Sequence, residues 1–125
     1  YGIFCTGPGA DANNFRFGVS SNNIYLDIYG ATSISTGPVS DGVWTHLAIT
    51  RTGGLIRAFV NGVLTQTTTT GGTTSITGTS WYVGVLGTAG GGNAWNGYID
   101  DLRFTQGVAR YTSTFTPPQV ALPRQ

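Results

Sequence analysis

Residues 43–52 read VWTHLAITRT, and this stretch decides the fold class. Successive side chains of an extended chain point to opposite faces. One face therefore carries Trp44, His46 and Ala48, and the other carries Leu47 and Ile49. A strand that is apolar on both sides lies centrally in a β-sandwich, packed on the facing sheet and covered by a loop on its other side. We therefore place Trp44 and His46 in the core, and we assign Trp81 to the core as well.

Short strands and tight turns continue on both sides of this stretch. Gly53-Gly54 turns the chain into LIRAFV, and Asn61-Gly62 supplies the positive φ angles of a type I′ hairpin. Period-two alternation predicts strands elsewhere. The predicted strands are 1–6, 15–19, 24–28, 33–38, 43–52, 55–60, 63–67, 81–86 and 94–105, with a short edge strand near Ile76 inside a Thr-rich loop and a flexible Gly-rich segment at 87–93.

The composition supports an all-β protein and excludes several classes of function. Charged residues make up 9% of the chain, far below the roughly 25% of typical globular domains, while Gly, Thr and aromatic residues are abundant. The Arg residues are scattered and the net charge is +1. This predicts no nucleic-acid partner, because nucleic-acid binding needs clustered cations. The sequence also lacks the long apolar run of a membrane span and the features of a signal peptide.

Four short motifs, in order, carry a family resemblance: WTHLAITR, AFVNGVL, WYVG and WNGYIDDLRF, within residues 43–105. The chain resembles laminin-G-like domains of the concanavalin A-like lectin and glucanase superfamily. The resemblance implies an antiparallel two-sheet jelly-roll sandwich. The closing stretch DDLRFTQGVARYTSTFTPP is similar to the ends of such modules in bacteriophage tail and head appendage proteins.

The resemblance also sets the expected domain boundaries. Residues 1–116 form the sandwich, and 117–125, which begin at Pro117-Pro118, form an extended tail. Domains of this type usually begin with two or three strands before the part that Tyr1 to Thr6 matches. We therefore expect an upstream segment or a neighbouring subunit to complete the sandwich by pairing with an open sheet edge.

The superfamily contains glycosidases, but this sequence favours a non-catalytic domain. Glycoside hydrolysis typically needs two converging carboxyl groups, whereas the chain has no Glu and its adjacent Asp100 and Asp101 point to opposite faces of a regular strand. His46 is the only histidine and lies between apolar neighbours, which favours a core residue with one hydrogen-bonded ring nitrogen. Cys5, the only cysteine, fits a small buried apolar side chain.

Calcium is the cofactor that the resemblance leaves open, because many relatives hold a calcium ion with Asp, Asn and backbone oxygens. The candidate ligands are Asp11 and Asn13, with Asn14 beside them, and Asp41. The same residues also form Asx-turns without any metal, so we expect no cofactor, and a calcium ion is the alternative.

Glycan binding requires an aromatic ring for the apolar face of a sugar and polar groups for its hydroxyls. Trp95, with Asn96 after it, follows the Gly-rich segment and fits this pattern best, although for Trp95 we favour the alternative of a ring that seals the end of the sandwich. Tyr25, Asp27 and Tyr29 share one face of a strand and form a second candidate patch, or else a solvated face or subunit interface.

The acidic pair Asp100 and Asp101 has a structural interpretation, in which Asp101 pairs with Arg103 on the same face and a bulge re-aims one side chain. The function predicted from all this is a non-catalytic structural and adhesion module of a bacteriophage virion protein, a tail fibre or capsid appendage. Its partners are other virion subunits or further copies of the chain, together with host-surface glycans. The alternative is a carbohydrate-binding module of a secreted, extracellular bacterial protein; a hydrolase comes third.

Overall fold

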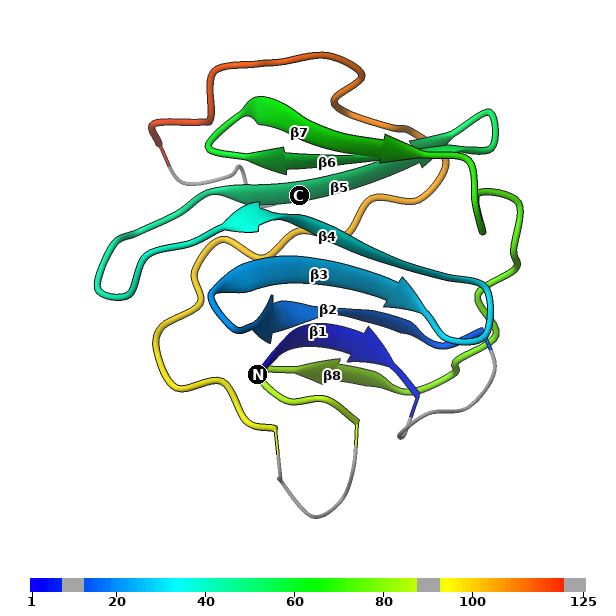
Figure 1. Ribbon diagram of the computed structural model, residues 1–125, viewed down its shortest axis with the longest axis horizontal. Coiled ribbons are helices and arrows are strands. Elements are labelled where there is room, and N and C mark those ends of the chain that lie inside the picture. The colour runs from blue at the N-terminus through cyan, green and yellow to red at the C-terminus, as the bar shows by residue number, and fades with distance from the viewer. Residues whose placement is uncertain (8–12, 88–92, 121–125) are drawn as a thin grey trace.

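The computed structural model describes residues 1–7, 13–87 and 93–120, and its regular structure consists of strands (Figure 1). No helix in those ranges is long and apolar enough to cross a membrane. The eight strands in these ranges are β1 (Gly2–Thr6), β2 (Phe15–Ser20), β3 (Asn23–Ile28), β4 (Thr32–Pro38), β5 (Leu47–Thr52), β6 (Leu55–Val60), β7 (Val63–Thr68) and β8 (Trp81–Val83).

The strands form two antiparallel sheets, which confirms the predicted all-β two-sheet sandwich. One sheet has five strands in the order β4-β3-β2-β1-β8, and the other has three in the order β5-β6-β7. Their facing sides pack together through aliphatic side chains: Leu26, Ile28 and Ile34 from the larger sheet meet Ile49 and Ile56 from the smaller one. A second cluster, around Ile3, Phe4, Val19 and Ile24, extends this core.

Three tight turns set the register of the hairpins. Asn61 and Gly62 have φ angles of 49° and 80° and join β6 to β7, as predicted for a type I′ turn. Gly53 and Gly54 join β5 to β6, also as predicted, while Ser21 and Asn22, with φ angles of 49° and 59°, join β2 to β3. Antiparallel pairing then follows residue by residue from each turn.

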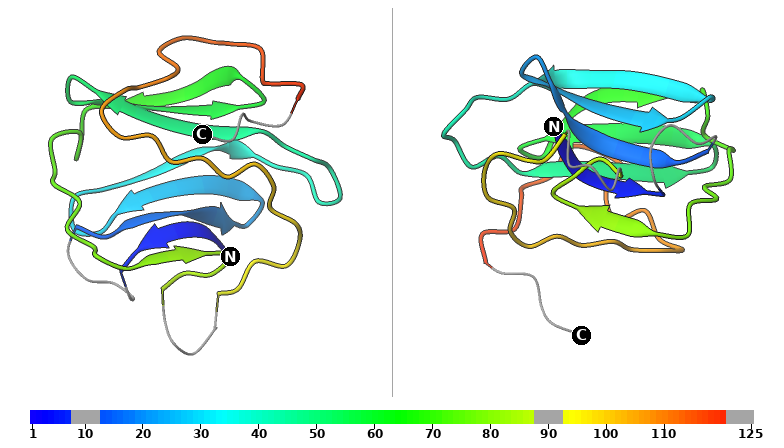
Figure 2. Two further views of the ribbon diagram at one scale, coloured as in Figure 1. Left: turned by 180° about the vertical axis from the view of Figure 1, so that it is seen from behind. Right: turned by 90° about the horizontal axis from the view of Figure 1, so that it is seen from below.

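After β8, residues 93–120 cross one side of the molecule without joining a sheet (Figure 2). Residues 111–116, which we call the strap, cover the outer face of the three-stranded sheet. The rings of Tyr111 and Phe115 lie 6.3 and 5.4 Å from the ring of Phe59 on β6. The Thr50 hydroxyl donates to the Tyr111 carbonyl at 2.8 Å, and the Phe115 amide donates to the Gly62 carbonyl at 2.9 Å.

The predicted position of the strand in 43–52 was wrong. Strand β5 begins at Leu47 and lies at an edge of its sheet, and β6 takes the central place. The outer face of β5 is covered as expected, because the strap lies over it. The loop before β5 leaves Trp44 70% exposed, so its assignment to the core was also wrong.

Three further strand predictions were wrong. Strand β8 ends at Val83 instead of Leu86, because Gly84 has a φ angle of 75° and turns the chain out of the ladder. The long strand predicted for 94–105 is irregular, because Asp101 has a φ angle of 48°, which breaks the alternation of side chains. No strand forms near Ile76, where residues 75–80 have no regular structure.

The assignment of Trp81 to the core was also wrong. It begins the edge strand β8 and is 52% exposed, since no further strand covers it in the described part of the chain. Its ring still packs edge-on against Phe4 and Phe104, with centroids 5.2 and 4.6 Å away. Cys5, in contrast, is 1% exposed, as expected of a small buried side chain, and burial raises the pKa of its thiol.

Candidate functional site

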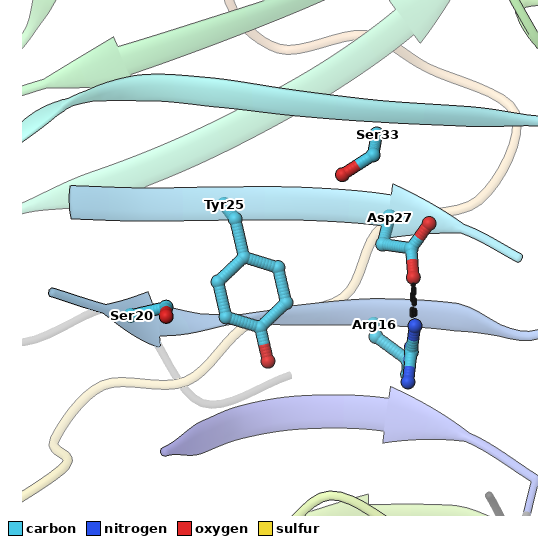
Figure 3. Close-up of a pocket in the computed structure, with 5 residues that line it drawn as sticks. All are labelled: Arg16, Ser20, Tyr25, Asp27 and Ser33. Carbon is cyan, nitrogen blue, oxygen red and sulfur yellow. Dashed lines mark hydrogen bonds and ion pairs between the residues drawn. The ribbon is translucent and has the colours of Figure 1, made fainter. Parts of the chain in front are cut away.

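An open hollow lies on the face of the five-stranded sheet that points away from the three-stranded sheet. It has a volume of about 350 Å³ and is lined by side chains from three neighbouring strands. Strand β2 supplies Arg16 and Ser20, β3 supplies Tyr25 and Asp27, and β4 supplies Ser33 (Figure 3). We call this set the polar hollow. Volumes of this order are typical of small-ligand sites.

The register of the hairpins builds the polar hollow. Arg16 lies opposite Asp27 on the next strand, and Asp27 in turn lies opposite Ser33, so the three form a row across the sheet. Their apolar neighbours in sequence, such as Leu26 and Ile28, point to the other side and are buried in the core. Alternate residues of the same strands therefore form the core on one face of the sheet and the polar hollow on the other.

A partly buried ion pair lies at one end of the hollow. The Arg16 Nε donates to Asp27 Oδ2 at 2.9 Å, and Nη2 donates to the same oxygen. The guanidinium also lies over the ring of Tyr29, with its central carbon 5.1 Å from the ring centroid. Asp27 is 8% exposed, so these contacts compensate for the burial of its charge.

Tyr25 forms a wall of the hollow beside this pair. Its ring leans from β3 towards β2, over a position where β2 has Gly18 (Figure 3). A Cβ at Gly18 would lie 2.3 Å from the Tyr1 carbonyl oxygen and 2.9 Å from the Tyr25 hydroxyl, so glycine fits this place between the Tyr1 backbone and the Tyr25 ring. Burial raises the pKa of Tyr25 above its ordinary value of 10.0, and its hydroxyl therefore stays protonated near neutral pH.

The second patch predicted from the sequence is therefore brought together, because Tyr25 and Asp27 line the hollow and Tyr29 supports Arg16. The site residues that were not predicted from the sequence are Arg16, Ser20 and Ser33. The alternation in FRFGVS was a usable signal for Arg16, since it places the side chain opposite the core. To predict that Arg16 pairs with Asp27, one must also know that the chain turns at Ser21-Asn22.

Trp95 and Asn96 do not join this site. The Trp95 ring is half-buried and packs on the core cluster of Ile3, Phe4, Val19 and Ile24, and its buried Nε1 has no hydrogen-bond partner in the described residues. Ile24 points to the opposite side of β3 from Tyr25. Trp95 thus seals the sandwich, which was the structural alternative, while Asn96 lies exposed beside it.

The proposed calcium ligands are not brought together. The Asn13 amide donates to the Tyr29 carbonyl just after β3, whereas Val39, two residues before Asp41, donates to the Asn22 carbonyl just before β3. The two candidates therefore lie near opposite ends of a six-residue strand, roughly 20 Å apart. Asp11 lies outside the described residues. Within those residues, no three His, Cys, Asp or Glu side chains are grouped for a metal.

The remaining structural residues lie elsewhere. Asp100 accepts a hydrogen bond from the Asp101 amide at 2.8 Å, and both are exposed on the irregular segment. The Asp101 to Arg103 ion pair stays a prediction. His46 is half-buried beneath the strap, with the Phe115 ring edge-on at 5.5 Å and a buried Nδ1 that has no partner in the described residues.

The two packed antiparallel sheets define the chain as an all-β sandwich of the lectin-like type. The family model described as the Concanavalin A-like lectin/glucanases superfamily, named Laminin_G_3, matches residues 2–120. The chain belongs to this superfamily.

The solved structures include a similar chain. It is residues 221–444 of an S-layer domain-containing protein from Clostridium thermocellum, 23% identical, with a TM-score of 0.43. The match covers 85% of the present chain and 57% of that chain. No match is found among curated proteins.

Proposed function

We propose that the chain is a non-catalytic carbohydrate-binding module of an extracellular protein, and that the polar hollow is its glycan site. One observation carries the proposal. Tyr25 presents a ring beside an ordered Asp27 and Arg16 pair, with the Ser20 and Ser33 hydroxyls at the margins. A ring packs against the apolar face of a sugar, and the polar groups satisfy its hydroxyls.

The lining of the hollow supports binding without hydrolysis. It contains a single carboxylate, Asp27, which is already ion-paired with Arg16. Hydrolysis by the usual mechanism uses a second carboxyl group across the glycosidic bond. The family description names both lectins and glucanases, and this lining fits the former.

The proposal takes the carbohydrate-binding alternative in preference to a bacteriophage virion part. The family description names lectins and glucanases, which are carbohydrate-active proteins. A virion location, with other virion subunits as partners, stays a prediction from the closing stretch of the sequence.

Glycan-array screening followed by calorimetry tests the function. Tyr25→Ala is expected to weaken binding about tenfold or more, because truncating a central aromatic contact typically costs over 1 kcal/mol. Tyr98→Ala is the matched control, since Tyr98 is 86% exposed and does not line the hollow. Equal losses in both variants, or no glycan bound by the wild type, would contradict the proposal.

A further inference from the structure

The polar hollow is electrically neutral. Arg16 is the cation of its lining and Asp27 is the anion, and the Nε and Nη2 of Arg16 both donate to the same carboxylate oxygen. Each charge is therefore neutralised by the other at close range. A charged ligand in the hollow meets no unpaired opposite charge among the lining side chains.

The Arg16 guanidinium is also held in place. Its side chain is 25% exposed and that of Asp27 is 12% exposed, and the Tyr29 ring supports the guanidinium. Turning Arg16 towards an anionic ligand would break both hydrogen bonds and leave Asp27 buried without its partner. Removing one partner of a buried pair is strongly unfavourable, so the pair resists opening for a sulfate or a carboxylate.

The other polar groups of the lining are hydroxyls. Ser20, Ser33 and Tyr25 each have one donor and accept as well. Such groups exchange hydrogen bonds with an alcohol in either direction, but they do not compensate the desolvation of a full charge. The lining is thus complementary to an uncharged ligand with several hydroxyls and an apolar face.

We infer that the hollow selects uncharged glycans over sulfated or uronic-acid glycans. The inference rests on the proposed function and adds the ligand's charge class. The internal Arg16 and Asp27 pair is the cause of the selection. Binding that involves no net charge on the protein side is screened little by salt.

Calorimetric titration with mannan, xyloglucan and dextran, and with heparin and polygalacturonate, tests the inference on the intact chain. We expect at least one neutral polymer to bind about tenfold more tightly than either anionic one. That affinity should change less than about twofold between about 0.05 and about 0.5 M sodium chloride.

Asp27→Asn tests the cause, because it leaves the Arg16 charge unpaired. This variant should gain heparin binding, by about tenfold, that disappears at high salt. Asp41→Asn makes the same change of net charge at an exposed carboxylate outside the hollow and should gain none. If Asp27→Asn does not fold, the double variant Arg16→Gln/Asp27→Asn, which has no charge in the hollow, should keep the preference for neutral polymers.

Three results would contradict the inference in different ways. Wild-type protein that prefers heparin or polygalacturonate through Tyr25, with affinity falling steeply in salt, refutes it and leaves the proposed function standing. Wild-type protein that binds neither class of polymer removes both the proposed function and the inference. Heparin binding gained equally by Asp41→Asn also refutes the assigned cause.

Discussion

Gly62 combines two demands that only glycine meets. Its φ angle of 80° lies in the left-handed region, and a Cβ there would lie 2.0 Å from the Phe115 carbonyl oxygen of the strap. Gly30 also has a φ angle of 80°, but nothing lies within 4 Å of its Cβ position. A side chain at Gly30 would therefore cause backbone strain alone, whereas a side chain at Gly62 would cause the same strain and also a clash with the strap.

Gly62→Ala is expected to lower the free energy of unfolding by about 3 kcal/mol or more, from strain together with displacement of the strap. Gly30→Ala should cost about 1 kcal/mol from backbone strain alone. Urea denaturation followed by fluorescence gives both values. Equal costs would show that the strap does not pack on the turn as described.

At the scale of elements, the strap is held by aromatic packing and three hydrogen bonds. Besides the Tyr111 and Phe115 contacts already given, the Leu64 amide donates to the Thr114 hydroxyl at 3.3 Å. His46 lies beneath it, facing the Tyr111 and Phe115 rings, while the Asn61 side chain binds the His46 amide at 2.9 Å. Burial lowers the pKa of His46 below 6.5.

This lowered pKa predicts the pH dependence of stability. The unfolded chain takes up the proton at higher pH than the folded chain, so acid favours unfolding. The contribution of His46 to stability is complete above pH 6.5 and falls as the pH drops from there towards the folded pKa. His46→Gln should flatten this part of the profile, measured by urea denaturation at a series of pH values. A wild type that becomes more stable on acidification through this range would contradict the packing of His46.

The elements that sequence could predict are those fixed by local chemistry. Asn61-Gly62 and Gly53-Gly54 define their turns, and alternation in residues 24–28 assigns Tyr25 and Asp27 to one face. The segment 94–105 could not be predicted, since its alternation is typical of a strand and the φ angle of Asp101 interrupts it. Trp44 was placed in the core because of the same alternation. The pattern in 43–52 does not reveal that the strand begins only at Leu47.

The polar hollow depends on how neighbouring strands pair, and the pattern of residues within one strand does not determine that pairing. Arg16 is adjacent to Asp27 only through the register of β2 and β3, and Ser33 only through that of β3 and β4. A one-residue slip would place Arg16 opposite Ile28 or Leu26 and destroy the site. The sequence therefore predicted part of the patch but not the ion pair that defines its chemistry.

On the scale of the whole molecule, few charges contribute to stability. The chain has six basic and five acidic residues, with a net charge of +1, so repulsion and attraction between surface charges are both small. The core of aliphatic and aromatic side chains provides the stability instead.

The melting temperature should consequently change by less than about 3 °C between about 0.05 and about 0.5 M sodium chloride. Sodium sulfate at the same ionic strength should raise it, because sulfate is excluded from protein surfaces and strengthens apolar burial. Differential scanning calorimetry measures both. A large rise in sodium chloride would indicate that charge repulsion limits the stability.

The order of the strands has a consequence for the time course of folding. Strands β1 to β4 and strands β5 to β7 each pair with their neighbours in sequence. Strand β1 also pairs with β8, which follows both groups in the sequence. Local hairpins form quickly, and contacts that close long loops form slowly. Two meanders can therefore assemble while the chain is still being synthesised, and the β8 and strap contacts complete the domain last.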